Sequence, residues 1–572
     1  MRTADSRWGG GVTLLLLVFI FLPLLAVLAN AVFPGLFFGQ ARFDGFGLVG
    51  EIFRRPLWRQ SMINSVTLAL GAATLGTALG GALATIRARW SFAAAKWIDL
   101  TAWVLLIAPS FMIAQGWVLF ASADGLVHEW LGWTWVTSLI FQPAGLVIVM
   151  ALSKFPLAYF AILAATEWNV RQFGHAARLN GAGPLTVWRT IELPLALPSY
   201  LAGWTLVFMD TIGDFGLPAA LATVYRFPTL TYSIYSAIYQ SPVRFDMAGV
   251  LAFYLVALLA LAMALLLFAV RRSRFDFLNA RAVQAVRAKP RHIWALNATV
   301  GAFLLVCLGI PIGTSAVVSV LKNMGGGLTS DNLTLGHYRE LLSATAGDHR
   351  LIDFAQGLAH SLAIAAAAAV FSMLIGFVVA YVLSFTEFRL KPALQLFSIL
   401  SLAVPGVVLG IGYIFIWNQK WLEPLGLHLY GTPALLVVAG IAGAIPYAVR
   451  VQLGAFGNLS GTMLKAAAIQ GAGTFDRMRT VVLPLVRQSL LIATLAAFGT
   501  SIFDLALASM LKPANYSLLP IVIDRAFEFS RYGYATAATV ASCVVVVAIL
   551  LLLQATGRAV FRRLDRKSAT KG

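Results

Sequence analysis

Three aspartates lie inside long apolar stretches of the chain. Asp210 and Asp214 occur in the run 199–217, and Asp504 occupies the position that matches Asp214 in the second half, 290 residues later. A carboxylate within the apolar part of a membrane is costly unless it faces a cavity or a partner. We therefore take these acids as candidates for lining a pathway that favours a cation.

The alternative is that the acids lie at helix ends beside lipid headgroups or pair with nearby basic residues. The basic residues considered are Arg226, Arg244, Lys512 and Arg525. Asp210 matches Thr500 in the duplicated register and has no symmetric counterpart. Lys154, in the predicted fourth helix, is expected to extend toward the cytoplasmic surface.

The sequence contains none of the short motifs that mark an enzyme. There is no GxxxxGK[ST] phosphate-binding loop, no HExxH and no CxxC pair, and the seven histidines are scattered. We therefore expect no catalytic residues, no metal site and no cofactor in this chain, and any nucleotide site would belong to another subunit.

The most informative stretch is present twice. Residues 175–194 have the sequence HAARLNGAGPLTVWRTIELP, and residues 465–484 have KAAAIQGAGTFDRMRTVVLP. Each copy predicts two short helices broken at Gly-Ala-Gly, with Pro184 in the first turn of the second helix. The small residues at the bend let another protein approach the backbone, which is a requirement of a docking element. The matched residues are Ala176, Ala177, Gly181, Gly183, Leu193 and Pro194 in the first copy, and Ala466, Ala467, Gly471, Gly473, Leu483 and Pro484 in the second.

These residues carry a resemblance to a known family. Ala-Ala, then Gly four residues later, then an aliphatic-x-Leu-Pro ending resembles the EAA loop of permease subunits of binding-protein-dependent (type I) ABC importers. In that family the loop forms coupling helices that dock in a groove of a cytoplasmic ATPase. His175 and Lys465 replace the leading Glu of the motif, which affects only a salt bridge or cap made by that Glu.

Composition places the chain in a membrane. It is 60% hydrophobic and 11% charged, against roughly 25% charged residues in soluble domains. The net charge of +19 comes from short basic clusters near the two termini and in 271–291. These clusters are typical of positive-inside anchors, whereas a nucleic-acid-binding protein would need a basic face on a soluble domain.

We predict an all-α polytopic membrane protein with about twelve spanning helices in two homologous halves. The predicted first unit is 1–275 with its cytoplasmic loop 167–198, the basic cytoplasmic linker is 276–292, and the second unit is 293–572 with its loop 456–488. Six spans in each half leave both termini in the cytoplasm of a bacterial inner membrane. The predicted spans are 12–33, 63–86, 98–120, 144–166, 199–217, 247–270, 295–320, 360–384, 395–416, 433–455, 489–510 and 535–557.

The fused two-unit form most resembles permeases of the ferric iron, thiamine, polyamine and aminoethylphosphonate import group. The resemblance implies two cytoplasmic ABC ATPase subunits that carry ATP and Mg²⁺, an extracytoplasmic solute-binding protein, and no nucleic acid partner. It favours ferric iron or another cationic solute such as thiamine, with polyamine or aminoethylphosphonate import as the alternative. A secondary transporter with two parallel repeats is the alternative from a different class, but such a carrier has no reason to keep the paired loops.

Overall fold

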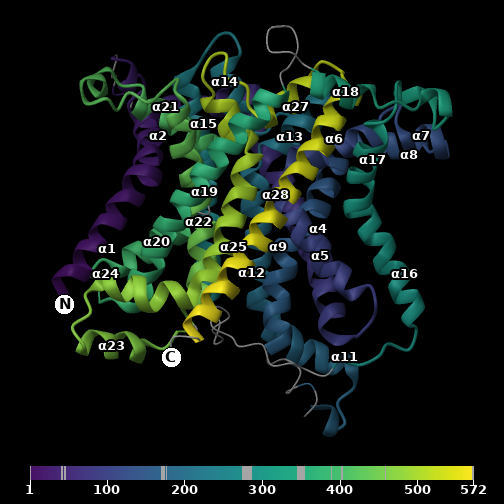
Figure 1. Ribbon diagram of the computed structural model, residues 1–572. Helices are drawn as coiled ribbons and strands as arrows, with labels where there is room; N and C mark the ends of the chain where they lie inside the picture. The colour runs from purple at the N-terminus through teal and green to yellow at the C-terminus, as the bar shows by residue number, and fades with distance from the viewer. Residues whose placement is uncertain are drawn as a thin grey trace. The chain divides into compact units, whose positions relative to one another are not determined.

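The computed structural model shows a helical protein. No strand occurs in the residues that the structure describes, where the extended pairings are two isolated bridges, Trp90 with Ala288 and Leu321 with Leu333. The prediction of an all-α polytopic membrane protein is confirmed (Figure 1). The described residues are 2–39, 43, 47–168, 174, 177–272, 287–343, 354–387, 389–400, 404–457 and 459–569.

The chain forms two compact units that do not follow the sequence halves. One unit contains Phe43–Thr334 with the short piece Ala31–Pro34, and the other contains Leu335–Gly572 with Met1–Asn30 and Gly35–Arg42. We call them the 43–334 unit and the 335–572 unit. The predicted boundaries at 275 and 293 describe the sequence repeat, whereas in the compact units the first helix of each half packs with the other half. Most of the predicted linker, 276–286, lies outside the described residues.

In both units, the first helix of one half packs against the other half where a glycine meets the carbonyl group of a proline. In the 335–572 unit a Cβ on Gly412 would lie 2.4 Å from the carbonyl oxygen of Pro23, and in the 43–334 unit a Cβ on Gly116 would lie 2.3 Å from that of Pro311. Only glycine permits such backbone contact. Tyr413 adds a hydrogen bond from its hydroxyl to the Phe19 carbonyl, 2.6 Å.

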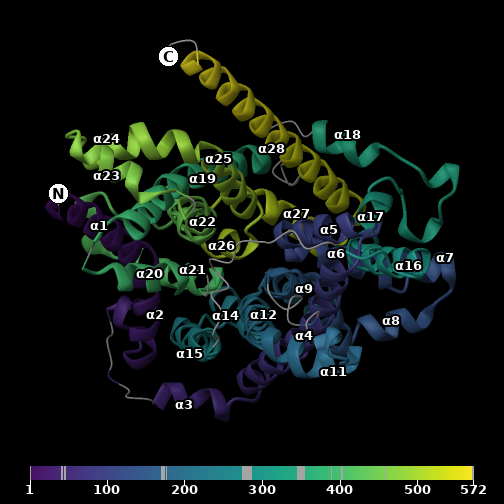
Figure 2. The same ribbon diagram turned by 90° about the horizontal axis from the view of Figure 1, so that it is seen from below.

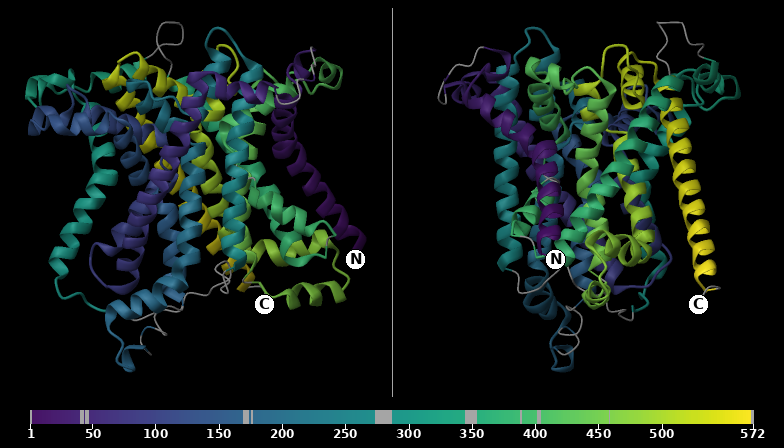
Figure 3. Two further views of the ribbon diagram at one scale, coloured as in Figure 1. Left: turned by 180° about the vertical axis from the view of Figure 1, so that it is seen from behind. Right: turned by 60° about the vertical axis from the view of Figure 1, so that its left-hand side comes forward.

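The exchanged helices are long and apolar. The N-terminal run consists of α1 (Arg2–Leu16), η1 (Leu17–Phe21) and α2 (Leu22–Val32). Figures 2 and 3 show this purple run beside the green α20 (Lys391–Leu400) of the same unit. Its counterpart in the 43–334 unit consists of α16 (Ile293–Leu304), η5 (Leu305–Gly309) and α17 (Ile310–Val318).

Each unit is built around three long helices that small residues bring close together. In the 43–334 unit these are α4 (Pro56–Arg89), α9 (Pro143–Trp168) and α12 (Leu193–Gly213), and in the 335–572 unit they are α19 (Phe354–Phe385), α22 (Pro433–Phe456) and α25 (Leu483–Ile502). A Cβ on Gly80 would lie 2.8 Å from the Phe155 carbonyl oxygen. Such close helix contact is typical of membrane proteins, where packing replaces the hydrophobic effect. The remaining principal helices are α3 (Gly47–Arg54), α7 (Leu126–Leu131), α8 (Thr134–Ile140), α14 (Leu230–Tyr239), α15 (Phe245–Arg272), α18 (Gly336–Ser343), α27 (Leu519–Glu528) and α28 (Tyr532–Ala569).

Four predicted spans are interrupted in the structure. The span predicted at 98–120 is divided at Pro109 into α5 (Ala95–Ile107) and α6 (Ser110–Ala121), and that at 395–416 is divided before Gly406 into α20 and α21 (Gly406–Trp417). Proline has no N–H to continue a helix and favours an extended residue before it, and Ala108 is extended. Among the described residues, eleven helices are long and apolar enough to span a membrane, and α21 is shorter.

The fifth span of each half is interrupted at a candidate acid. The predicted helix 199–217 ends at Gly213, and α13 (Gly216–Leu221) follows Asp214. The predicted helix 489–510 ends at Ile502, and α26 (Leu505–Leu511) follows Asp504. In both cases the aspartate carboxylate accepts a hydrogen bond from the backbone N–H three residues later, at 3.0 Å. Asp504 is therefore the N-cap of α26, and Asp214 lies one residue before the N-cap of α13, Phe215.

Candidate functional site

The two repeated loops have the same backbone turn at their central glycine. Gly181 has φ +83° and Gly471 has φ +88°. The amide of the next residue, Ala182 or Ala472, donates to the carbonyl of Ala177 or Ala467 at 3.0 and 3.1 Å. This six-to-one bond, with the left-handed residue before it, is a Schellman motif, and it favours glycine because other residues are strained there. The first glycine of each Gly-Ala-Gly therefore allows the left-handed backbone conformation that the turn requires.

The space around these glycines is open. A Cβ added at Gly181, Gly183 or Gly471 would meet no heavy atom within 4 Å. The backbone of the bend is therefore not covered by other residues of the chain at these positions, and docking of a partner there stays a prediction. Gly473 differs because it begins a short helix, with its amide bonded to the Asp476 carboxylate at 3.3 Å.

After each bend the chain runs into a long helix without a loop. In the first copy α11 (Pro184–Val187) leads through the π turn η3 (Trp188–Glu192) into α12, which begins at Leu193 and Pro194. The start of α11 at Pro184 confirms the predicted helix start. In the second copy α23 (Gly461–Ile469) precedes the bend, and α24 (Thr474–Arg477) leads through η10 (Met478–Val482) into α25, which begins at Leu483 and Pro484.

The two π turns have a common cause. Pro194 and Pro484 lack the N–H that an α-helix would bond to the carbonyl four residues earlier, and a wider turn accommodates the missing bond. The helical backbone therefore continues from each bend into α12 or α25 without an intervening loop. Residues Ala176 and His175 lie outside the described residues.

A pair of exposed apolar side chains flanks each bend, and sequence reasoning missed it. Leu179 is 89% exposed and Leu185 is 73% exposed, and their counterparts 290 residues later, Ile469 and Phe475, are 87% and 59% exposed. Exposed apolar residues thus recur at matching positions of the two copies, a feature that is common at protein–protein interfaces. The signal was present in the sequence, since both positions are apolar in both copies.

The loops are anchored to their units by different interactions. Glu192 forms an ion pair with Arg89 at the end of α4 and lies 3.9 Å from Arg178. The matching residue in the second copy is Val482, which is fully buried in an apolar cluster with Tyr381 and Met478. One loop is therefore held by charge and the other by packing.

The structure brings Asp210 and Asp214 together on one lysine. Lys154 Nζ lies 2.6 Å from Asp210 Oδ2 and 2.7 Å from Asp214 Oδ2. The Ser110 hydroxyl donates to Asp214 Oδ1 at 2.8 Å. The expectation that Lys154 extends toward the cytoplasmic surface is wrong, because α9 and α12 pack side by side and leave the ammonium group facing the acids.

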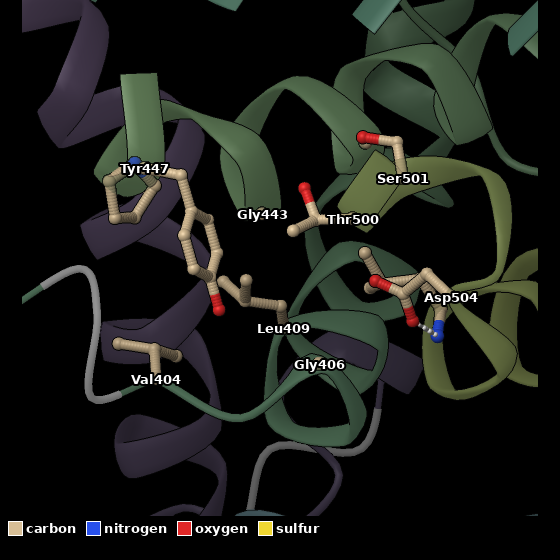
Figure 4. Close-up of a pocket in the computed structure, with 11 residues that line it drawn as sticks. Val404, Gly406, Leu409, Gly443, Tyr447, Thr500, Ser501 and Asp504 are labelled. Carbon is tan, nitrogen blue, oxygen red and sulfur yellow. Dashed lines mark hydrogen bonds between the residues drawn. The ribbon is translucent and has the colours of Figure 1, made fainter. Parts of the chain in front are cut away.

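Asp504 lies in a different environment, within the 335–572 unit. The positions that match Lys154 and Asp210 are Ala444 and Thr500, so neither the lysine nor the second acid is present. Asp504 lines a cavity of about 180 Å³ together with Gly443, Tyr447 and Thr500 (Figure 4). No group of three or more His, Cys, Asp or Glu side chains suited to a metal occurs among the described residues.

Comparisons with known proteins identify transport permeases that are similar to this chain. Residues 372–567 match the family model described as the inner membrane component of binding-protein-dependent transport systems. The chain is 22% identical to the ferric transport system permease protein FbpB of Actinobacillus pleuropneumoniae, over 95% of this chain and 77% of the relative. It is 25% identical to the thiamine transport system permease protein ThiP of Brucella suis biovar 1, over 74% of this chain and 73% of the relative. It is also 29% identical to the molybdenum transport system permease protein ModB of Escherichia coli K12, over 33% of this chain and 81% of the relative.

Proposed function

Because the chain is a permease of the binding-protein-dependent importer family, we propose that it passes a small solute from an extracytoplasmic binding protein to the cytoplasm. Two cytoplasmic ABC ATPase subunits would dock on the paired loops and hydrolyse ATP. The observation that carries this proposal is the repeated bend itself, with open glycines, exposed apolar flanks and uninterrupted passage into α12 and α25.

The loops would act as levers. When the ATPase subunits close on ATP, each grips the exposed pair, Leu179 with Leu185 or Ile469 with Phe475. The force then passes through the π turns into α12 and α25. Asp214 directly follows α12 and Asp504 lies two residues beyond α25, so the motion would reach the acids at the far ends of these helices. The energy source lies in the partners, and this chain supplies mechanical coupling.

The proposed orientation places both termini and both loops in the cytoplasm of a bacterial inner membrane. Support comes from the basic clusters near the termini and in 271–291. The loops then face the compartment that contains ATP.

The proposed cargo is ferric iron or another small cationic solute such as thiamine. Two relatives are named for ferric and thiamine transport, and the fifth helix of each half ends at an acid. Polyamine and aminoethylphosphonate remain alternative cargoes. The pathway role of Asp210, Asp214 and Asp504 belongs to the same proposal.

The test is ATPase activity of the complex purified from its native host and reconstituted with its binding protein. We expect one solute from a panel of ferric iron, thiamine, polyamines and aminoethylphosphonate to stimulate hydrolysis. If no ATPase co-purified and transport followed an ion gradient instead, a secondary carrier would replace this proposal.

Docking is tested separately by charge substitution at the exposed flanks. Leu179→Glu with Ile469→Glu is expected to abolish co-purification of the ATPase, because an unpaired charge would be buried in the interface. Leu342→Glu is the matched control, since Leu342 is 87% exposed on α18 and lies outside both loops. If the wild type, the Leu179→Glu/Ile469→Glu double variant and the Leu342→Glu control retained the ATPase equally, docking on these loops would be contradicted.

A further inference from the structure

The cavity beside Asp504 is lined almost entirely by one unit's membrane helices. Its walls come from α21, α22, α25 and α26, and its volume is about 180 Å³. This volume is large enough for several water molecules or a small organic group. The polar groups on its wall include Asp504, Tyr447, Thr500 and Ser501 (Figure 4).

A glycine leaves the carboxylate uncovered. A Cβ on Gly443 would lie 3.9 Å from Asp504 Oδ2 and 3.7 Å from Leu507 Cδ1. Any larger side chain at position 443 would extend into the cavity in front of the acid. Asp504 Oδ1 accepts the capping hydrogen bond from the Leu507 amide of α26 at 3.0 Å, and Oδ2 is the oxygen nearer to Gly443.

The first half shows what this cavity lacks. There the matching acid, Asp214, is satisfied by the Lys154 ammonium group at 2.7 Å and by the Ser110 hydroxyl at 2.8 Å. At the position of Lys154 the second half has Ala444. No basic side chain lies within ion-pair distance of Asp504 among the described residues. In the first half Asp214 therefore shares a lysine with Asp210, whereas in the second half the single acid, Asp504, has no lysine at the matching position.

We propose that the cavity beside Asp504 binds the positive charge of the transported solute and that this site exists in the second half alone. The inference rests on the proposed function and assigns its cargo site. The ligand chemistry is a cation that interacts with oxygen atoms, either an ammonium-type group or a hydrated metal ion. One carboxylate with neighbouring hydroxyl groups attracts such a cation out of an apolar surround. It supplies too few anionic ligands to strip the water from a ferric ion, so the cation is released readily.

The experiment measures equilibrium binding to the full chain in lipid nanodiscs with its co-purifying ATPase. The probes are radiolabelled ferric citrate, thiamine and putrescine. Asp504→Asn is expected to weaken binding at least tenfold, and Asn remains a good helix cap, so the change removes charge and keeps α26 capped. Gly443→Val is expected to weaken binding similarly by filling the cavity. Gly454→Ala, on the same helix and with open space around it, is expected to stay within twofold of the wild type.

The outcomes separate this inference from the function on which it rests. If the wild type binds or imports one probe and both Asp504→Asn and Gly443→Val do so equally well, the cavity site is wrong and the importer stands. If the wild type retains its ATPase and binds none of the probes, the cationic cargo and the cavity site both fail. Ferric citrate is an anionic chelate, so binding of ferric citrate alone would contradict a site for positive charge, and binding of thiamine or putrescine alone identifies an organic cation.

Discussion

Substitution of Gly471 tests why the repeated bend needs glycine. With φ +88°, an L-residue at this position is strained by about 1–2 kcal/mol. A methyl group added to Gly471 would have no heavy atom of this chain within 4 Å, so within the chain the substitution acts through backbone strain and not through a clash. If docking requires the left-handed bend, Gly471→Ala should weaken ATPase binding by about 5- to 30-fold, because 1.4 kcal/mol corresponds to tenfold in affinity.

Asparagine distinguishes backbone strain from steric bulk. Asn is larger than Ala yet tolerates the left-handed region better, since its side chain bonds locally. Gly471→Asn should therefore bind the ATPase more tightly than Gly471→Ala. The affinity is measured by titrating the purified ATPase onto the permease in nanodiscs, without nucleotide and with a non-hydrolysed ATP analogue.

A control in the first loop adds a methyl group where no strain arises. Gly183 has no left-handed φ and no atom within 4 Å of an added Cβ, so Gly183→Ala is expected to change affinity less than threefold. If Asn at position 471 proved as harmful as Ala, or worse, then bulk against the partner would be the reason for glycine, and the backbone argument would be refuted.

Three further predictions concern the anchors, the buried ion pair and an outer acid. Arg89→Gln should make cargo-stimulated hydrolysis less sensitive to salt, because it removes the ion pair that holds Glu192. Val482→Ala should lower the free energy of unfolding by about 2 kcal/mol and leave the salt sensitivity of hydrolysis unchanged. Equal salt profiles for the two variants would contradict the conclusion that one loop is held by charge and the other by packing. Lys154→Met should lower the unfolding temperature, because it leaves Asp214 buried without a counter-ion at a cost of about 3 kcal/mol. Adding Asp214→Asn should restore part of the lost stability. If it restored none, the loss of the Lys154–Asp214 ion pair would not be the cause of the destabilisation. Burial raises the pKa of Asp524, in α27, to about 7 from its ordinary 3.8, with Glu528 adding repulsion. Because the folded state then holds a proton that the unfolded state releases, thermal stability should fall as pH rises from about 4 to 7, and Asp524→Asn should flatten this dependence in unfolding scans.

Much of the loop architecture follows from local rules and was accessible from the sequence. Long apolar runs with few charges require helices across a membrane, since the backbone has no water to bond there. The repeat located both loops, and Gly-Ala-Gly after an alanine pair specifies a helix end, because glycine alone adopts the left-handed turn without strain. The predicted loops 167–198 and 456–488 extended too far, because α12 and α25 already begin at Leu193 and Leu483.

Other features depended on which segments meet in space, and sequence spacing does not determine that. Lys154 and Asp214 are 60 residues apart, and only the packing of α9 against α12 makes them partners. The exposure of Leu179 and Ile469 also became visible only when the rest of each unit was found not to cover them.

The sequence by itself determined the helical class, the duplication and the position of the paired bends, because these depend on hydropathy and on local backbone preference. Tertiary structure decided three other matters. The units exchange their first helices through Gly116 and Gly412, one acid is neutralised, and the other faces a cavity. The physical reason is that burial, counter-ions and close contacts are properties of pairs of segments, and these pairs form only when the chain has folded.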